Sequence, residues 1–229
     1  MLDRTLRTYP IGDKIRGTTL YYNNSTGVKN WSECRSCILC NGRRRVCVRR
    51  DGMRTWSNTT RYIKLLFIGE APGATEDITG IPFTGRSGRV LNQIFEYTQA
   101  SFEFCITNTI CCKPKDVEVL MPEGIDDEET LNTLEPIYEY SNHNRKPAPA
   151  EIIACSSHIH EIVSTFRPRG IIYLGQVASN NFLPARTIPS LNLLHPASIV
   201  REEYKVIPMR KQAKKLTDFI KDILGDNQI

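Results

Sequence analysis

Four short apolar runs stand out in a mostly polar chain, and each of them ends abruptly. They occupy residues 63–69, 104–112, 170–175 and a stretch that begins at residue 188 and ends at His195. Continuous apolar runs of this length are typical of strands buried on both faces, where no alternation is needed. The pattern therefore predicts four buried strands.

Apolar residues recur at helical spacing between these runs. In residues 87–98 the apolar side chains share one face of a helix. Residues 148–166, 176–183 and 209–224 carry similar patterns, and Pro149 suits the first turn of the second of these helices. Strands that alternate with helices predict an α/β fold with a mainly parallel sheet.

Polar or small residues lie at or near the carboxyl end of each predicted strand. They are Glu70, Asn108, Gly175 and His195. In parallel sheets, ligands bind outside the carboxyl ends of the strands. We therefore expect a carboxylate, an amide, bare backbone and an imidazole to meet at one rim of the sheet.

Two segments depart from the α/β pattern. Residues 1–30 are polar and turn-rich, and we interpret them as an N-terminal extension of one domain that spans residues 31–229. An insert at about 115–144 carries nine acidic residues between positions 116 and 143 and no lysine or arginine there. It predicts an irregular, disordered loop. Its charge would repel DNA, so we expect it to point away, to cover another surface or to contact another protein.

Size and composition limit the class of protein. A chain of 229 residues suffices for one sizeable core, and we expect a monomer. No apolar run is long enough to span a membrane. The first residues form no apolar signal region, so we expect a protein that is not secreted and lies in the cytoplasm or wherever the genome is.

The modest net charge of +5 is unevenly distributed. Residues 29–64 are rich in arginine and contain only two acidic residues, Glu33 and Asp51. Such a basic block fits a polyanionic partner, and it equally fits a solvated basic face.

Eight cysteines in a chain without an export signal argue against a disulfide framework. They are grouped unevenly, as Cys34, Cys37, Cys40 and Cys47, then Cys105, Cys111 and Cys112, and finally Cys155. Metal ligation by thiolates is the leading explanation of this grouping.

Six motifs occur in a fixed order along the chain: GEAPGATED, GIPFTGRSG, NTICCKP, NRKPAPAEIIAC, GIIYLGQVA and HPAS. In order and spacing they resemble those of the family 4 uracil-DNA glycosylases, and the resemblance covers roughly residues 31–225. It implies a three-layer α/β/α sandwich with a four-stranded, mainly parallel sheet. It also implies that the protein hydrolyses the N-glycosidic bond of uracil in DNA and leaves an abasic site.

The resemblance also implies roles for residues around a uracil flipped out of the stack. Phe83 would stack on the base, and Asn108 would read its edge. His195 would lie against uracil O2 and stabilise the charge that develops there. Glu70 would orient water or stabilise the cationic sugar.

Further residues of the same motifs would surround the base or the duplex. Those expected to contact the base are Gly69, Ala71, Gly73 and Asp77. The segment after His195 would enter the duplex as a loop, with Ile199 as the candidate wedge.

A 4Fe–4S cluster is implied by the same resemblance, with the ligands Cys34, Cys37, Cys112 and Cys155. Zinc in the same ligands is the alternative cofactor. Cys40 forms an equally good pair with Cys37 by spacing, and Cys111 is adjacent to Cys112. Because successive side chains of a strand point to opposite faces, we expect only one of the two adjacent thiols to reach the cluster.

Other functions remain open at this stage. A catalytically inactive relative could use the same fold to bind DNA or a partner. A relative that cross-links to the abasic sugar would carry glutamine in place of Ala71 and a histidine-bearing loop, and the sequence TGRSGRVLNQ leaves no room for that loop. A generic metal-stabilised α/β domain is the last alternative.

Overall fold

The computed structural model describes the chain in several ranges. They are residues 20–23, 37, 39, 49–56, 62–120, 137–140, 145–182, 187–201 and 206–225. Three cysteines considered as ligands or spare thiols, Cys34, Cys40 and Cys47, lie outside these ranges.

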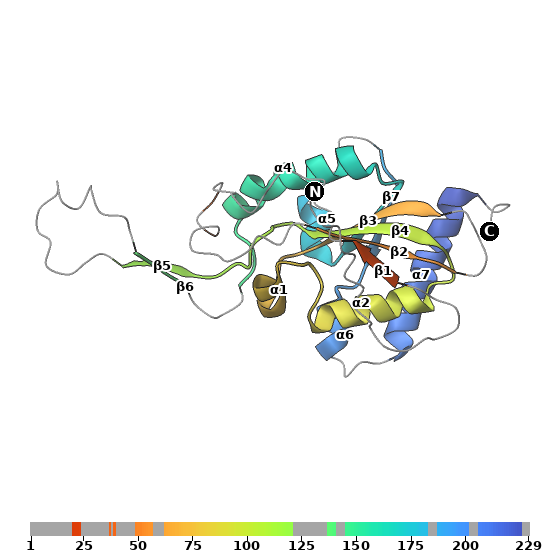
Figure 1. The fold of residues 1–229 in the computed structure, drawn as a ribbon, viewed down its shortest axis with the longest axis horizontal. Coiled ribbons are helices and arrows are strands. Elements are labelled where there is room, and N and C mark those ends of the chain that lie inside the picture. The colour runs from red at the N-terminus through yellow and green to blue at the C-terminus, as the bar shows by residue number, and fades with distance from the viewer. Residues whose placement is uncertain are drawn as a thin grey trace, which may run out of the picture.

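A six-stranded sheet forms the centre of the molecule (Figure 1). Its strands follow the order β1 (Leu20–Asn23), β2 (Arg50–Arg54), β4 (Phe102–Asn108), β3 (Ile63–Gly69), β7 (Gly170–Leu174) and β8 (Ser190–Leu193). The last four pair in parallel, which confirms the predicted parallel sheet. The first two strands are not among those predicted, and they extend the sheet antiparallel beyond β4.

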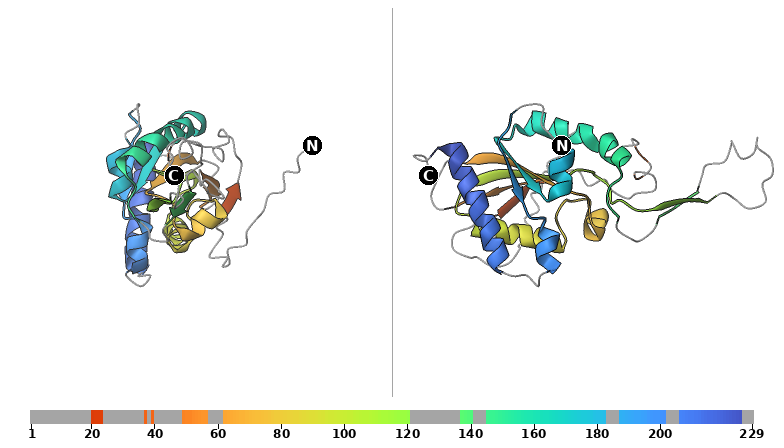
Figure 2. Two further views of the ribbon diagram at one scale, coloured as in Figure 1. Left: turned by 90° about the vertical axis from the view of Figure 1, so that its left-hand side faces the viewer. Right: turned by 180° about the vertical axis from the view of Figure 1, so that it is seen from behind.

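Helices cover both faces of this sheet (Figure 1, and from behind in Figure 2). The long helices are α2 (Arg86–Tyr97), α4 (Pro149–Phe166) and α7 (Val206–Leu224), and the shorter α5 is Gln176–Asn181. Leu66 and Ile68 of β3 belong to the core beneath α4 and α5. The side chains of Leu65 and Phe67 point to the opposite face of the sheet and belong to the core beneath α2 and α7. The three-layer sandwich is therefore confirmed.

Two short helices lie at the carboxyl end of the sheet. They are α1 (Ala74–Thr79), which follows β3, and α6 (Pro196–Arg201), which follows β8. A loop was expected after His195 in place of α6, and that prediction is wrong. Proline suits the first turn of a helix because its missing N–H would have no partner there.

The acidic insert is more regular than predicted. Strands β5 (Val117–Leu120) and β6 (Ile137–Tyr140) form a two-stranded antiparallel ribbon, with Val117 opposite Tyr140. In Figure 1 the ribbon projects away from the sandwich. The predicted irregular loop is therefore wrong for the strands described, whereas the ribbon does extend away from the body.

Within the described ranges, no helix has the length and apolar character needed to cross a membrane.

Candidate active site

A pocket of about 590 Å³ opens at the carboxyl ends of β3, β4 and β8. Glu70, Phe83, Asn108 and His195, which were expected to meet around one base, all line it. Gly175 was expected at the same rim and contributes differently, since it is not a lining residue. Its φ is 92°, and a Cβ there would lie 3.0 Å from the Cβ of His195. The missing side chain therefore leaves room for the imidazole.

Asn108 is the last residue of β4 and is 1% exposed. Its side-chain Oδ1 accepts no hydrogen bond from any described residue, although Asn108 lines the pocket. A buried acceptor without a partner costs about 1–3 kcal/mol. The pocket therefore offers an amide oxygen whose hydrogen bond a ligand can complete.

Gly69 lies beside this amide on the neighbouring strand, and the ladder pairs it with Asn108. A Cβ at this position would lie 2.5 Å from Asn108 Oδ1 and 2.6 Å from Phe83 Cζ. The backbone carbonyl of Gly69 accepts hydrogen bonds from the N–H and the hydroxyl of Thr109, at 2.8 and 2.9 Å. Only glycine lets the amide and the aromatic ring approach the strand this closely.

Phe83 presents its ring to the pocket from a loop between α1 and α2. The side chain is 5% exposed, and the ring centroid lies 6.1 Å from that of His195. The backbone of Phe83 adopts a φ of 56°, in the left-handed region that bulky residues rarely occupy. Strained conformations of this kind cluster at functional sites.

His195 follows β8 and is held by the first turn of α6. Its Nδ1 accepts a hydrogen bond from the backbone N–H of Ala197 at 3.2 Å, which places the proton of the neutral ring on Nε2. Burial, assisted by the positive charge of Arg201, lowers the pKa of His195 to about 4. At neutral pH the pocket therefore contains a neutral imidazole with one N–H donor.

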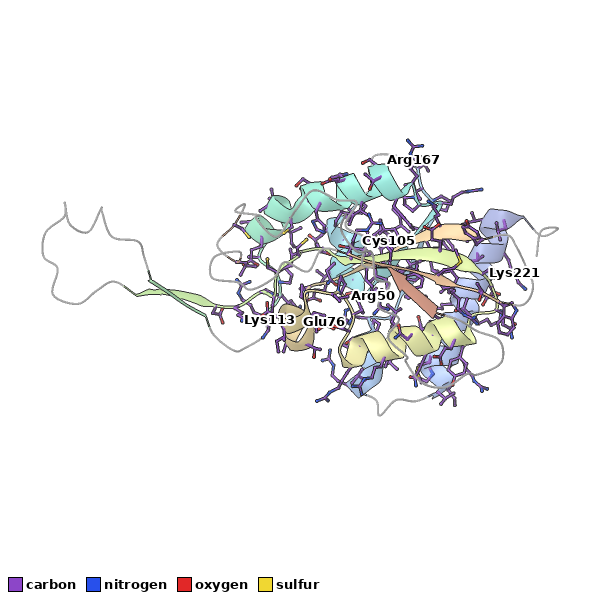
Figure 3. The ribbon with its side chains drawn as sticks, in the orientation of Figure 1. Arg50, Glu76, Cys105, Lys113, Arg167 and Lys221 are labelled. Carbon is purple, nitrogen blue, oxygen red and sulfur yellow. The ribbon has the colours of Figure 1, made fainter. Side chains whose placement is uncertain are left out.

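Two carboxylates line the pocket. Glu70 follows β3 directly, at the position expected. Glu76, on α1, is 8% exposed, and its Oε1 accepts a hydrogen bond from the backbone N–H of Gly85 at 2.6 Å. This bond ties α1 (Figure 3) to the end of the loop that carries Phe83. A Cβ on Gly73 would lie 2.8 Å from Glu76 Oε2, so a side chain there would displace this carboxylate oxygen.

Four of the five cysteines that the structure describes form one cluster, here called the thiol cluster. Cys37, Cys111, Cys112 and Cys155 pack together, and the last three are buried. The ligand atoms of Cys111, Cys155 and His158 lie within 4.8 Å of one another. This group could bind a metal ion, because soft thiolates are the ligands of zinc and of iron–sulfur clusters.

Both neighbouring thiols pack in this cluster, and because β4 ends at Asn108 they lie beyond the strand, where strand alternation does not apply. Only Cys111 belongs to the group of possible ligands with Cys155 and His158, so the expectation that one of the two thiols reaches a metal stays a prediction. A hydrogen bond with the Cys111 thiol lowers the pKa of Cys155 to about 7 against the opposing effect of burial. The thiolate, the form that binds metals, is thereby favoured.

Comparisons with known proteins agree with this geometry. The family model described as "Uracil DNA glycosylase superfamily" matches residues 58–224. The chain belongs to the uracil DNA glycosylase superfamily. The resemblance drawn from the six motifs is therefore confirmed.

Curated relatives share part of the chain. It is 33% identical over 115 residues to the type-4 uracil-DNA glycosylase of Saccharolobus solfataricus, covering 49% of this chain and 41% of the relative. The corresponding protein of Archaeoglobus fulgidus is 27% identical, covering 67% and 61%. That of Thermotoga maritima is 26% identical, covering 68% and 64%. The matched segments thus span less than two thirds of the length of each of these relatives.

Three expected site residues do not line the pocket: Gly69, which lies beside Asn108 and Phe83, and two residues that lie elsewhere. Asp77 forms an ion pair with Lys115 at 3.1 Å and does not line the pocket. Ile199 is 1% exposed and packs in the core formed with Val90, Ile94 and other apolar residues. Because α6 turns this side chain inward, Ile199 is not available for insertion into a duplex, and its assignment as the wedge is withdrawn.

Several lining residues were not expected from the sequence. They are Glu76, Arg86, Ser87, Arg145 and Arg201. The first four lie inside the motifs quoted above, so motif membership was the available signal. Ala71 and Gly73, by contrast, were expected and do line the pocket.

Part of the basic block serves the interior. Arg54 of β2 is fully buried and donates hydrogen bonds to the backbone carbonyls of Phe95, Glu96 and Thr98. These bonds give partners to carbonyl groups at the end of α2, where the intrahelical ladder ends, and the Phe95 carbonyl accepts from the N–H of Thr98 as well. Arg54 is therefore not available to a polyanion.

Proposed function

We propose that this protein is a uracil-DNA glycosylase, which takes uracil out of the DNA stack and hydrolyses its N-glycosidic bond. The observation that carries the proposal is the buried Asn108 Oδ1, which has no hydrogen-bond partner among the described residues and lies in one pocket with Phe83 and His195. An enzyme that acts on a base must first extrude it from the duplex into such a pocket.

Base recognition is assigned to Asn108. The N3–H of uracil can donate to Oδ1, while the O4 atom can accept from the side-chain nitrogen. Cytosine presents an acceptor at N3 and a donor at its amino group, so the same amide would face two mismatched partners. Sites built on hydrogen bonds reject such mismatches strongly, because buried polar groups are left unpaired.

Stabilisation of the leaving base is assigned to His195. As the glycosidic bond lengthens, negative charge grows on the uracil ring and reaches O2. The Nε2–H of the neutral imidazole can donate a hydrogen bond to that oxygen as the charge develops. The low pKa of His195, about 4, keeps the ring in this form at neutral pH.

The sugar side of the reaction is assigned to Glu70. Its carboxylate lines the same pocket and can either orient the attacking water or stabilise the oxocarbenium-like sugar. Arg86 and Arg201 also line the pocket, and their guanidinium groups suit the phosphates next to the flipped nucleotide. The proposed partner is therefore DNA that contains uracil.

For the cofactor, we propose a 4Fe–4S cluster held by Cys34, Cys37, Cys112 and Cys155, with zinc as the alternative. The packing of Cys37, Cys111, Cys112 and Cys155 in one cluster supports a thiolate site at this place. Cys111 is the rival of Cys112, because its ligand atom lies within 4.8 Å of those of Cys155 and His158. A bound metal centre would supply a cross-link between the segment at Cys37, the turn after β4 and helix α4. A monomeric state and a contact between the acidic insert and another protein stay predictions.

An alkaline cleavage assay tests the proposed reaction. The protein is incubated with an oligonucleotide that contains one uracil, and alkali then breaks the strand at abasic sites. Wild-type protein should give breaks, and Asn108→Ala or His195→Ala should reduce them by about 100-fold or more. His160→Ala, an exposed histidine on α4 outside the pocket, is the matched control.

The same assay separates the other candidate functions. A binding module would retard the oligonucleotide in a gel and give no breaks. A cross-linking relative would give a protein–DNA species that survives denaturation. Either outcome with wild-type protein would contradict the proposed reaction.

A further inference from the structure

We propose that Arg50 is a positioning residue that holds the Phe83 ring in place to stack on the base. The inference rests on the proposed function, because it assigns a partner to the aromatic ring of that site. Arg50 belongs to β2, one of the strands that the hydrophobic pattern does not predict, and it does not line the pocket.

The guanidinium of Arg50 bridges two parts of the site's framework. It is 4% exposed and lies between the sheet and α2 (Figure 3). Its Nη1 donates to the backbone carbonyl of Phe83 at 2.6 Å, and its Nη2 donates to Asn92 Oδ1 at 2.9 Å. Asn92 is itself 5% exposed and belongs to α2. Arg50 thus fixes the Phe83 carbonyl relative to α2.

The backbone held in this way is strained. Phe83 has a φ of 56°, where the Cβ of an ordinary residue crowds its own backbone. Such a conformation persists only when the surroundings over-determine it. The charge-assisted bond from Arg50 is one such constraint.

Gly88 is the second constraint. A Cβ on Gly88 would lie 1.7 Å from the Phe83 carbonyl oxygen, so only glycine lets this carbonyl lie against α2. The carbonyl of Phe83 therefore lies against Gly88 and also accepts the hydrogen bond from Arg50.

The ring position follows from the backbone. With Phe83 in this conformation, its Cζ lies 2.6 Å from where a Cβ of Gly69 would be, and its centroid is 6.1 Å from that of His195. If residue 83 relaxed to a negative φ, the ring would leave this place between strand and imidazole. Arg50 therefore acts on the base through Phe83.

Arg54 provides a matched comparison. It lies on the same strand, is equally buried and also donates to backbone carbonyls, but its partners lie at the end of α2 and outside the pocket. A purely structural role of Arg50 would make Arg50→Met and Arg54→Met alike.

The test uses the full-length protein in two assays. The first is the rate of uracil excision under single-turnover conditions, and the second is inhibition by free uracil. Arg50→Met should lower the excision rate by about 10-fold or more, and it should raise the inhibition constant of free uracil by a similar factor. Arg50→Lys keeps the charge but not the two-pronged geometry, so it should recover only part of the loss. Arg54→Met should lower the melting temperature while uracil inhibition changes by less than about 2-fold.

A double-mutant comparison tests whether Arg50 acts through the Phe83 ring. If Arg50 acts through the ring, Arg50→Met should cost less than about 2-fold when added to Phe83→Leu. The inference would be overturned if Arg50→Met lowered the excision rate equally in the wild type and in Phe83→Leu. It would also be overturned if free uracil inhibited Arg50→Met as strongly as it inhibits the wild type. If Arg50→Met does not fold, Asn92→Ala is put through the same comparison, and additive losses there would overturn it too.

Failure of this inference is distinguishable from failure of the proposed function. Wild-type protein that excises no uracil contradicts the function before any variant is made. If the wild type excises uracil and Arg50→Met excises it equally well, only the inference is contradicted.

Discussion

Gly69→Ala is the substitution that most directly displaces the side chains proposed to contact the base. The new Cβ would lie 2.5 Å from Asn108 Oδ1 and 2.6 Å from Phe83 Cζ. Ordinary contacts between such atoms begin near 3.4 Å, so the amide and the ring must each move by about 1 Å. Both groups are proposed to contact the base, and one methyl group displaces them together.

The expected loss is large in activity and modest in stability. Misplacement by about 1 Å costs on the order of 100-fold in rate, so kcat/KM for uracil excision should fall by about that factor. Overpacking of a buried site costs about 1–3 kcal/mol in the free energy of unfolding. Single-turnover cleavage of the uracil oligonucleotide and urea unfolding measure the two effects.

Gly170→Ala is the matched control for overpacking. A Cβ there would lie 2.9 Å from Leu65 Cδ2 and from Phe219 Cε1, in the core and away from the pocket. It should lower stability and leave excision within about 3-fold of the wild type. Excision by Gly69→Ala within the same factor would refute the reasoning, because it would show that the amide and the ring need not occupy these positions.

Three further predictions concern the pKa of His195, the ion pair of Arg145 with Glu151, and the thiol cluster. The pKa of His195, about 4 in the folded protein, lies below the ordinary value of 6.5, so the unfolded chain binds this proton first. Stability should therefore fall as the pH drops from about 6.5 to 4, and urea unfolding should show a smaller fall in His195→Gln. Arg145 donates to both oxygens of the buried Glu151 and to the Lys115 carbonyl, so Arg145→Met should cost about 2 kcal/mol of unfolding free energy, whereas exposed Lys214→Met should change it by less than about 0.5 kcal/mol. Cys155→Ser should lower metal content and melting temperature, whereas Cys105→Ser, outside the thiol cluster, should leave the metal content unchanged.

The parallel strands β3, β4 and β7 were predictable because they are buried almost throughout, whereas the edge strand β8 exposes Ser190 and Asn192 and is not the buried strand that was predicted. Runs such as residues 63–69 consist almost entirely of apolar residues, and no other element needs that pattern at that length. Their carboxyl ends then placed Glu70, Asn108 and His195 at one rim, where the pocket is found.

The antiparallel strands were not predictable from the same rule. The strand β2 reads RDGMR, which by composition belongs to a solvated basic segment. Its two arginines are buried because each finds carbonyl acceptors on or next to α2, more than thirty residues away. Such a pairing depends on tertiary contacts that no local pattern encodes.

The site errors also have a local cause. Glu76 and Asp77 are adjacent on α1, and successive residues of a helix point about 100° apart. The sequence shows two carboxylates and does not show which one faces the pocket: Glu76 lines it, whereas Asp77 pairs with Lys115, and a contact of Asp77 with the base stays a prediction. Ile199 was taken for a loop residue because the turn of α6 that begins at Pro196 was missed.

A crystal structure of the protein with free uracil, the product of the proposed reaction, tests the central claim most directly. The account predicts that the base stacks on Phe83, donates its N3–H to Asn108 Oδ1 and directs O2 toward His195 Nε2. A base bound outside this pocket, or bound there with Asn108 Oδ1 still lacking a hydrogen-bond partner, would contradict it.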